Sequence, residues 1–370
     1  MSAHAHTLRS VLPIEMVDGV LQHLPRRDLV GCIMVNSIFY TIASRVLYHT
    51  IDDLHPSQSI LCLLVLSKTP HLRPHVRHLE IDWYQHTTSP TGNLYTLLHR
   101  VLTHLPYLTS LSLELPRTHA PFRLLTHLPF SLTHFTTSLP CDQPLAHFLD
   151  TQPTLTDLTL RGLPAHPADS PLSHHHLAIL PPPFPFLSTP NHPRTNFTLR
   201  PTSLPNLHAL RTVHGGPNII TSVVQNRPVQ VASIALFPGL ACEALRALAT
   251  STVPMRRLSI MSFDPGAQEF LLRELAERFP GLEALHVVVL LCEYTHDLLK
   301  ESAPLLAGFK SLQYITFMAA TDPLYSAPGE QDIARLWHEA CPTLRTIILP
   351  RGRVWFEGRE GVGDLGELGR

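Results

Sequence analysis

Histidine and cysteine are the residues of this chain with the most versatile chemistry. The sequence holds 25 histidines and 6 cysteines, whose side chains bind transition metals and take part in acid–base and nucleophilic catalysis. The histidines fall mainly in expected loops and at expected helix ends, with no HExxH motif and no paired arrangement with cysteine. The cysteines are scattered without a C-x-x-C pair, so their spacing predicts neither a zinc site nor a disulfide framework and favours a reducing compartment.

Two other patterns look like ligand-binding motifs but lack the surroundings that such sites need. Gly361, Gly363 and Gly366 spell G-x-G-x-x-G, yet a dinucleotide site needs a helix that opens from these glycines, and only four residues follow Gly366. The run His174–His176 could hold a metal ion only weakly, and only if it is exposed. No P-loop and no G-x-S-x-G elbow occurs. We therefore expect a protein that is not an enzyme and that binds no cofactor and no metal.

The composition is that of a chain with a large core and little net charge. Of the 370 residues, 44% are hydrophobic and 15% are charged, and the formal net charge is -1. This balance predicts neither nucleic acid nor an anionic membrane as a partner. The longest apolar runs, Ile60–Leu66 and Val287–Cys292, are too short to span a bilayer, and the N-terminus lacks the apolar stretch of a signal peptide. We expect a soluble protein of the cytoplasm or the nucleus.

Beyond residue 70 one short apolar pattern, close to L-x-x-L-x-L, recurs and indicates repeating strands. Its central residues are Leu79, Leu111, Phe135, Leu158, Leu210, Ile234, Leu258, Leu285, Ile315 and Ile347. Successive centres lie 23 to 32 residues apart, except for one step of 52 residues. These steps leave room for a helix between strands, as in a solenoid with one strand and one helix in each turn.

Helical periodicity in the connecting sequence agrees with this plan, at Leu240–Thr250, Ala267–Phe279 and Asp332–Cys341. The expected fold class is therefore α/β: residues 76–350 form a solenoid with parallel strands on its concave face and helices outside. The array resembles irregular leucine-rich repeats, although it lacks the regular Asn or Cys after each strand. A general α/β domain whose parallel strands share a pattern is the alternative.

Three further segments complete the expected organisation. Residues 163–203, within the long step, are rich in proline and histidine and are expected to form an inserted loop, because proline breaks both helices and strand ladders. Residues 52–75 are expected to be a linker that holds a helix at Ser57–Lys68. Residues 351–370 are expected to form a C-terminal cap, with Trp355 and Phe356 packed down, and a frayed glycine-rich tail.

The N-terminal stretch 12–51 has the densest helix signals of the chain. Ile14, Val17, Leu21 and Leu24 recur at three- and four-residue spacing, which lines one face of a helix. Two more short helices follow, the second after Pro25. Three helices in about forty residues bury too little apolar surface to be stable alone, so a partner is expected.

Several residues of this stretch fall where the F-box motif carries its characteristic side chains: Leu12-Pro13, Glu15, Leu24-Pro25, Asp28-Leu29, Val35-Asn36 and Phe39. Residues 1–51 thus resemble an F-box with its core at 12–51, in the fungal F-box-like form that ends in Ala43–Tyr48. The resemblance implies docking to a Skp-family adaptor and, through it, to a cullin. The residues implied for adaptor docking are Leu12, Pro13, Ile14, Val17, Leu21, Leu24, Leu29, Val30, Val35 and Phe39. A helical cap on the solenoid is the alternative.

The repeats predict where a second partner would bind. Their leucines are expected to point into the core, so the alternate residues face the concave side. These residues are Glu80, Asp82, Glu114, Asp157, Arg161, Arg257, Met261, His286, Tyr314 and Met318. Together with the F-box resemblance they suggest a substrate-recognition adaptor of an SCF-type ubiquitin ligase that binds a protein target. The alternative function is a leucine-rich-repeat interaction scaffold whose F-box-like helices act outside ubiquitination.

Overall fold

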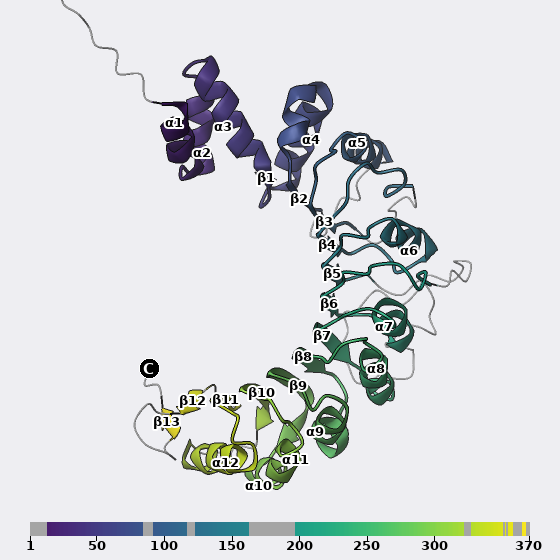
Figure 1. The fold of residues 1–370 in the computed structure, drawn as a ribbon, viewed down its shortest axis with the longest axis vertical. Coiled ribbons are helices and arrows are strands. Elements are labelled where there is room, and N and C mark those ends of the chain that lie inside the picture. The colour runs from purple at the N-terminus through teal and green to yellow at the C-terminus, as the bar shows by residue number, and fades with distance from the viewer. Residues whose placement is uncertain are drawn as a thin grey trace, which may run out of the picture. The chain divides into compact units, whose positions relative to one another are not determined.

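The computed structural model describes residues 13–83, 92–116, 123–162, 197–321, 327–350, 352, 354–357 and 365–367, which Figure 1 colours along the chain. Two compact units make up the chain. The first comprises Met1–Ser112 and His127–Phe130, and the second comprises Leu113–Thr126 and Ser131–Arg370. The division falls within strand β3 (Ser110–Glu114).

Three short helices open the first unit: α1 (Ile14–Gln22), α2 (Arg26–Ile33) and α3 (Ser37–His49). Pro13 and Pro25 directly precede α1 and α2, where a missing amide proton costs no helical hydrogen bond. Asn36 caps α3, because its side-chain oxygen accepts a hydrogen bond of 2.9 Å from the Phe39 amide. The expectation of three helices within residues 12–51 is confirmed.

The rest of the first unit packs the expected linker into its core. The elements are β1 (Thr50–Ile51), α4 (Pro56–Lys68), the 3-10 helix η1 (Pro70–His75), β2 (His78–Asp82) and α5 (Gly92–Leu102). Helix α4 begins one residue before the expected helix, and β1, which the sequence pattern did not indicate, pairs in parallel with β2. The Trp83 indole donates a buried hydrogen bond of 2.8 Å to Ser59 Oγ. Residues 52–75 are therefore an integral part of this unit.

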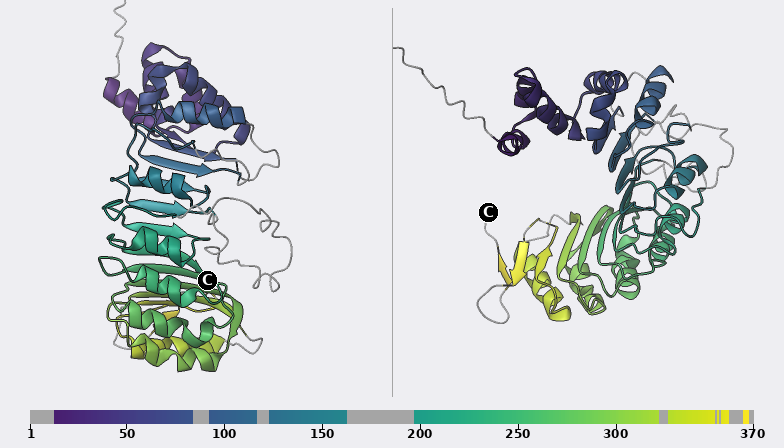
Figure 2. Two further views of the ribbon diagram at one scale, coloured as in Figure 1. Left: turned by 90° about the vertical axis from the view of Figure 1, so that its right-hand side faces the viewer. Right: turned by 45° about the horizontal axis from the view of Figure 1, so that its top comes forward.

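Parallel strands dominate the second unit, in which each strand from β4 to β11 pairs with the next one along the chain. They are β4 (His134–Thr137), β5 (Asp157–Leu160), β6 (Ala209–Thr212), β7 (Val231–Leu236), β8 (Arg257–Ser262), β9 (Ala284–Tyr294), β10 (Tyr314–Thr321) and β11 (Thr346–Ile348). Two antiparallel strands follow, β12 (Val354–Glu357) and β13 (Leu365–Glu367). Figure 2 shows the strands stacked edge to edge.

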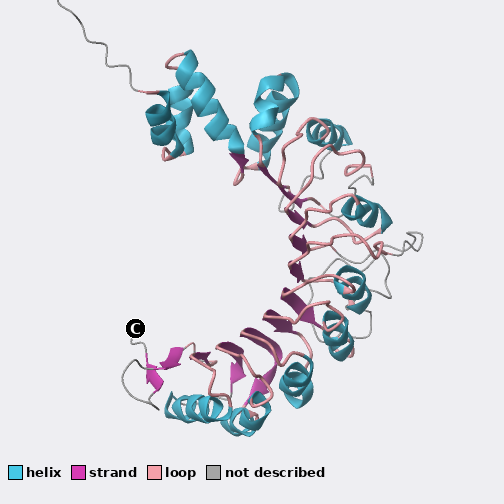
Figure 3. Ribbon diagram, in the orientation of Figure 1, coloured by secondary structure: helices cyan, strands magenta, loops and turns pink. Residues whose placement is uncertain are grey.

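Helices occupy most of the connections between these strands. They are α6 (Gln143–Asp150), α7 (Pro217–Val224), α8 (Ala241–Leu248), α9 (Ala267–Arg278), α10 (His296–Glu301), α11 (Ala303–Leu306) and α12 (Ala327–Ala340). Figure 3 shows these helices on one side of the strands, so that the other face of the sheet is open over the described residues. The three helices expected from periodicity correspond to α8, α9 and α12, and α12 begins five residues earlier than expected. The unit is thus a mixed α/β structure with a mostly parallel sheet.

The strand register confirms the expected repeat centres of this unit with one exception. Leu210 and Leu258 both pair with Ala232 of β7, whereas Ile234 was expected to be the equivalent residue. Both β7 residues are buried on the helix side, because side chains two positions apart share a face. Periodicity therefore identified the correct face but could not separate two positions on it.

The repeat leucines line the side of the sheet that the helices cover. Leu210, Leu258 and Leu285 are 1%, 1% and 0% exposed, respectively. Arg257 on the alternate set is exposed, and His286 is half-buried. The expected division between core-facing and outward-facing residues is therefore confirmed on these strands.

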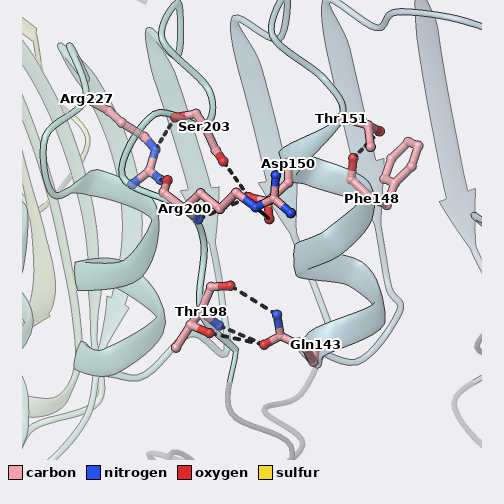
Figure 4. Close-up of polar contacts among 8 residues, drawn as sticks. All are labelled: Gln143, Phe148, Asp150, Thr151, Thr198, Arg200, Ser203 and Arg227. Atoms are coloured by element: carbon pink, nitrogen blue, oxygen red, sulfur yellow. Dashed lines mark hydrogen bonds and ion pairs between the residues drawn. The ribbon is translucent and has the colours of Figure 1, made fainter.

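The last seven residues of the expected insertion at 163–203 are described by the structure and contact the rest of the second unit. Residues 163–196, which include His174–His176, lie outside the described residues. Residues 197–203 are held against α6, as Figure 4 shows: Thr198 exchanges hydrogen bonds of 3.2 to 3.4 Å with Gln143, and the Asp150 carboxylate accepts from the Arg200 amide at 3.1 Å and from the Ser203 hydroxyl. The last residues of the expected inserted loop therefore have fixed polar contacts with α6.

A buried guanidinium secures the same segment from its other side. Arg227 is 2% exposed and lies just after α7. It donates at 2.8 Å and 2.9 Å to the carbonyls of Ser203 and Arg200, and at 2.7 Å and 2.9 Å to those of Ser222 and Gln225. Burial lowers the pKa of Arg227, and the nearby Asp150 carboxylate opposes this shift. The side chain thus ties the returning segment to the end of α7.

The C-terminal segment agrees with the expected cap as far as it is described. Trp355 on β12 is 3% exposed and pairs with Ile347 of β11. The side chain of Phe356, residues 358–364 and residues 368–370 lie outside the described part of the chain. Strand β13 pairs with β12, so part of the expected tail extends the sheet.

Replacing Arg227 with methionine should lower the free energy of unfolding by at least about 3 kcal/mol, because four carbonyls lose their buried charged donor. Urea denaturation followed by circular dichroism measures the change. Arg246→Met on the exposed side of α8 is the matched control and should stay within about 0.5 kcal/mol of the unsubstituted protein. Equal effects of the two substitutions would contradict the structural role of Arg227.

Candidate partner-binding surfaces

Histidine, cysteine and acidic side chains could form a metal site or a reactive centre only where the fold brings them together. No three His, Cys, Asp or Glu side chains gather there as a metal site requires. Burial raises the pKa of the Cys62 thiol to about 11 and that of Cys141 to about 12. At neutral pH these thiols are protonated and are poor nucleophiles. Among the helices that the structure describes, none has the length and apolar character needed to cross a bilayer.

The three N-terminal helices bury half of the residues expected to dock to an adaptor. Leu21 and Leu29 are 1% and 2% exposed and form a small core together with Ile42 and Ala43. Val17, Leu24 and Phe39 are partly buried and pack against that core. These five expected docking residues therefore hold the helices together.

Four of the other five expected docking residues are exposed and free to contact a partner. Pro13 is exposed, Ile14, Val30 and Val35 are 54%, 56% and 61% exposed, and Leu12 lies outside the described residues. Several exposed apolar side chains of the same helices were not expected: Met16, Val20, Met34 and Ile38. A helical wheel would have indicated Met16 and Val20, because they lie four residues apart on a face distinct from the core stripe.

Val30, Met34, Val35 and Ile38 define what we call the α2–α3 corner. Val30 and Met34 lie one helical turn apart, and Val35 and Ile38 follow directly in the turn and the first residues of α3. Met34 is 84% exposed and Ile38 is 52% exposed. The corner is therefore a local concentration of apolar side chains in contact with solvent.

A second exposed apolar stripe lies on α4. Leu61, Leu64 and Val65 are 62%, 38% and 40% exposed and recur at three- and four-residue spacing, while Leu63 and Leu66 on the other side are buried. A helix that is apolar on both sides is usually covered on both sides. This stripe adds to the apolar surface of the first unit.

A pocket of about 340 Å³ lies beside α1 and α3, with Ile42 in its lining. The Arg45 guanidinium pairs with Asp18 there, and Gln22 also donates to this carboxylate at 3.0 Å. The Arg45 hydrogen bond holds the pKa of the Asp18 carboxyl below its usual value, so the rim carries a fixed ion pair at neutral pH. The remaining lining residues are Ile14, Glu15, Thr41 and His75.

The open face of the second unit brings together about half of the residues expected to bind a target. Register places Arg257 beside Ala284, and Ala284 beside Tyr314. Met261 and Met318 lie in the same way on either side of Val288. The rings of His286 and Tyr314 are 5.0 Å apart. These residues therefore form one surface over β8, β9 and β10.

The other expected target residues lie elsewhere. Arg161 forms an ion pair of 3.0 Å with Glu114, and Asp157 lies on β5 with one carboxylate oxygen 3.5 Å from His134 Nε2. Glu80 and Asp82 lie on β2 and belong to the first unit. Three exposed residues of the open face were not expected, namely Arg211, Val213 and Leu290. The alternating pattern could have indicated Arg211, which lies between the buried Leu210 and Thr212.

A bulge in β9 exposes two adjacent leucines. The pairing of β10 shifts between Ala319 and Ala320, from Val289 to Glu293, which leaves residues 290–292 of β9 without a partner on β10. Leu290 and Leu291 in this bulge are 45% and 37% exposed. Bulges re-aim side chains and often lie beside functional surfaces.

Comparisons with known proteins do not assign a family. The chain matches no family profile and no curated protein. It is similar in structure to a Bacteroides fragilis protein, a structural genomics target known from its crystal structure, with 12% identity and a TM-score of 0.45. That match covers 90% of this chain and 82% of the other. A similarity at this level carries no functional assignment.

Alkylation of Cys62 at pH 8 should be about a hundredfold slower in the folded protein than in the protein unfolded in guanidinium. A pKa raised from 9.0 to about 11 lowers the reactive thiolate fraction by about that factor. The rate in the folded protein should rise about tenfold per pH unit until pH approaches 11. Mass spectrometry of iodoacetamide-treated protein measures both rates. Equal rates in the two states would show that the thiol is not protected.

Proposed function

We propose that this protein is a substrate-recognition adaptor of an SCF-type ubiquitin ligase. Helices α1 to α3 would dock to a Skp-family adaptor as an F-box, and the open sheet of the second unit, as a leucine-rich-repeat-like array, would bind a protein target. Ubiquitin transfer would be the work of other subunits, so the chain itself would perform no chemistry. A cytoplasmic or nuclear location follows from that role.

The observation that carries this proposal is the α2–α3 corner. Val30, Met34, Val35 and Ile38 are each more than half exposed, although soluble proteins rarely leave such side chains together in water. Complete burial of one large apolar side chain contributes about 1.5–3 kcal/mol, and these four are on average about two thirds exposed, so a partner that covers them gains roughly 4–8 kcal/mol before the entropic cost of association. A partner surface of matching apolar character is thus the most economical explanation.

The division of labour among the ten docking residues also supports the proposal. Five of them build the core of the three helices, and the described remainder stays exposed next to that core. The order of these residues along the chain is the order in which the F-box motif carries them. A helical cap needs no exposed corner, since its apolar side chains would all pack onto the structure that it covers.

The open face of the second unit supports target binding. Tyrosine, methionine and arginine are side chains that protein interfaces favour, and Met261 and Arg257 on β8 and Tyr314 on β10 lie on the two strands that flank β9. A rigid sheet holds these side chains in place before the target arrives, which lowers the entropic cost of binding.

The double substitution Val30→Asp and Met34→Asp tests the docking surface. Both side chains are exposed, so the helices should keep their circular dichroism spectrum while a charged corner repels an apolar partner. In affinity purification from cells, recovery of a Skp-family adaptor and a cullin should fall at least tenfold, equivalent to about 1.4 kcal/mol.

Met261→Asp, on the open sheet, is the matched control and should recover the adaptor as the unsubstituted chain does. If the unsubstituted chain recovers no Skp-family adaptor, the ligase function is wrong and an interaction scaffold outside ubiquitination takes its place. Equal recovery by the corner variant would assign docking to another surface.

A further inference from the structure

We infer that the open face of strands β6 to β9 binds an extended acidic peptide segment, with carboxylates on Arg211 and Arg257 and aliphatic side chains on Met261 and Leu290. This inference rests on the proposed target-binding role of the second unit and names the chemistry of the target. It is argued from strand register, from the charges that remain unpaired and from the exposed apolar side chains.

Register places the two arginines on either side of β7. Arg211 pairs with Ser233, and Arg257 pairs with Val231. Neighbouring strands lie about 4.8 Å apart and successive residues rise about 3.3 Å, so the two arginine Cα atoms are roughly 12 Å apart. An extended arginine side chain covers about half of that distance. A carboxylate above Ser233 and Val231 is therefore within reach of both guanidinium groups, and these small side chains leave room for it.

The charges on this face are complementary to an anion. Within the part of the chain that the structure describes, neither Arg211 nor Arg257 has an acidic partner, and both are exposed. At the β3–β5 end, Glu114 is paired with Arg161 at 3.0 Å. Asp157 accepts a hydrogen bond of 2.8 Å from the Thr156 hydroxyl and lies 3.5 Å from His134 Nε2. Its Cα atom is roughly 8 Å from that of Arg211, which pairs with Thr159, so it offsets part of the charge at β6 without forming an ion pair. The residues that flank Arg257, Val231 and Ala284, are uncharged, so the positive charge at β8 is left uncompensated.

One further carboxylate lies on this side of the sheet beyond the β9 bulge. Glu293 pairs with Ala320 of β10. Arg257 is level with Tyr314 of β10, because both pair with Ala284, and Tyr314 lies six residues before Ala320. At about 3.3 Å per residue the separation is about 20 Å, too far for an ion pair and beyond a Debye length at physiological salt. Glu293 therefore does not neutralise the arginines.

Arg211, Arg257, Met261 and Leu290 make up what we call the peptide seat. Its apolar part lies farther along β8 and β9. Met261 is four residues beyond Arg257 on β8, about 13 Å along the strand, and pairs with Val288. Met261 and Leu290 are 43% and 45% exposed. An extended peptide has nearly the same rise per residue and points every second side chain to one face. A peptide with Glu and Leu four positions apart therefore matches both parts of the seat.

A protein segment fits this seat better than a nucleic acid does. Two unpaired arginines neutralise too few phosphates for strong backbone binding, and the chain as a whole has a formal net charge of -1. The exposed apolar side chains Met261 and Leu290 are aliphatic and offer no stacking platform for bases, and the two rings of this face, His286 and Tyr314, are half-buried and lie 5.0 Å from each other.

The test uses the full-length protein and fluorescein-labelled twelve-residue peptides that contain Glu-x-x-x-Leu among serines and threonines. Fluorescence anisotropy should show at least tenfold tighter binding of this peptide than of a peptide with Gln in place of Glu. Addition of 0.5 M NaCl should remove most of the difference, because exposed ion pairs are screened. The double variant Arg211→Gln and Arg257→Gln should bind the Glu peptide at least tenfold more weakly. The matched control Arg246→Gln, on the helix side, should bind it normally.

Three results would overturn the inference: equal binding of the Glu and Gln peptides, unchanged binding by the double arginine variant, or absence of saturable binding by any peptide. Stronger competition by a single-stranded oligonucleotide than by the Glu peptide would assign the seat to nucleic acid and overturn it as well. Adaptor recovery is measured separately on the same double variant and should be normal. Charge-selective peptide binding by a chain that recovers no adaptor would support the seat and reject only the ligase function.

Discussion

The second unit depends on one geometric constraint, which is that parallel strands cannot be joined by a tight turn. Each pair from β4 to β11 needs a crossover, and the helices that supply most of the crossovers lie on one side of the strands. The leucines of each strand and the apolar sides of these helices then bury one another, as the 0% exposure of Leu285 and Leu271 shows. The same constraint leaves the opposite face of the sheet uncovered, which makes it the natural place for a partner.

Sequence periodicity predicted the elements of this fold better than their register. A period of two identifies the buried face, but Ala232 and Ile234 lie on the same face, and only pairing with Leu210 and Leu258 shows which one is the repeat centre. Strand β1 was missed because two residues are too few to show alternation. In the three N-terminal helices both core and surface side chains are apolar, so hydrophobicity alone does not show that Met16 is exposed, although its place on the helical wheel, away from Leu21, would have indicated it.

The long step between β5 and β6 shows how polar contacts can replace periodicity. Loop closure adds only about 0.6 kcal/mol for each doubling of loop length, so the length of the connection is a minor cost. Asp157 still pairs in parallel with Ala209 across this connection. Asp150 and Arg227 hold the returning segment through hydrogen bonds to its backbone. Sequence alone gives little sign of this role, since a lone arginine after a helix is most often exposed.

The two candidate surfaces differ in how they combine stability with binding. On β8, outward side chains alternate with the buried Leu258, Ile260 and Ser262, so Arg257 or Met261 can change without altering the buried side of the strand. On the short helices that separation is weaker, because Val17 and Phe39 are partly buried beside exposed apolar neighbours. The outward side chains of the sheet can therefore be substituted at little cost in stability. The helices bury only a small core, so under the proposed function a partner there would add stability that the sheet already has from its own core.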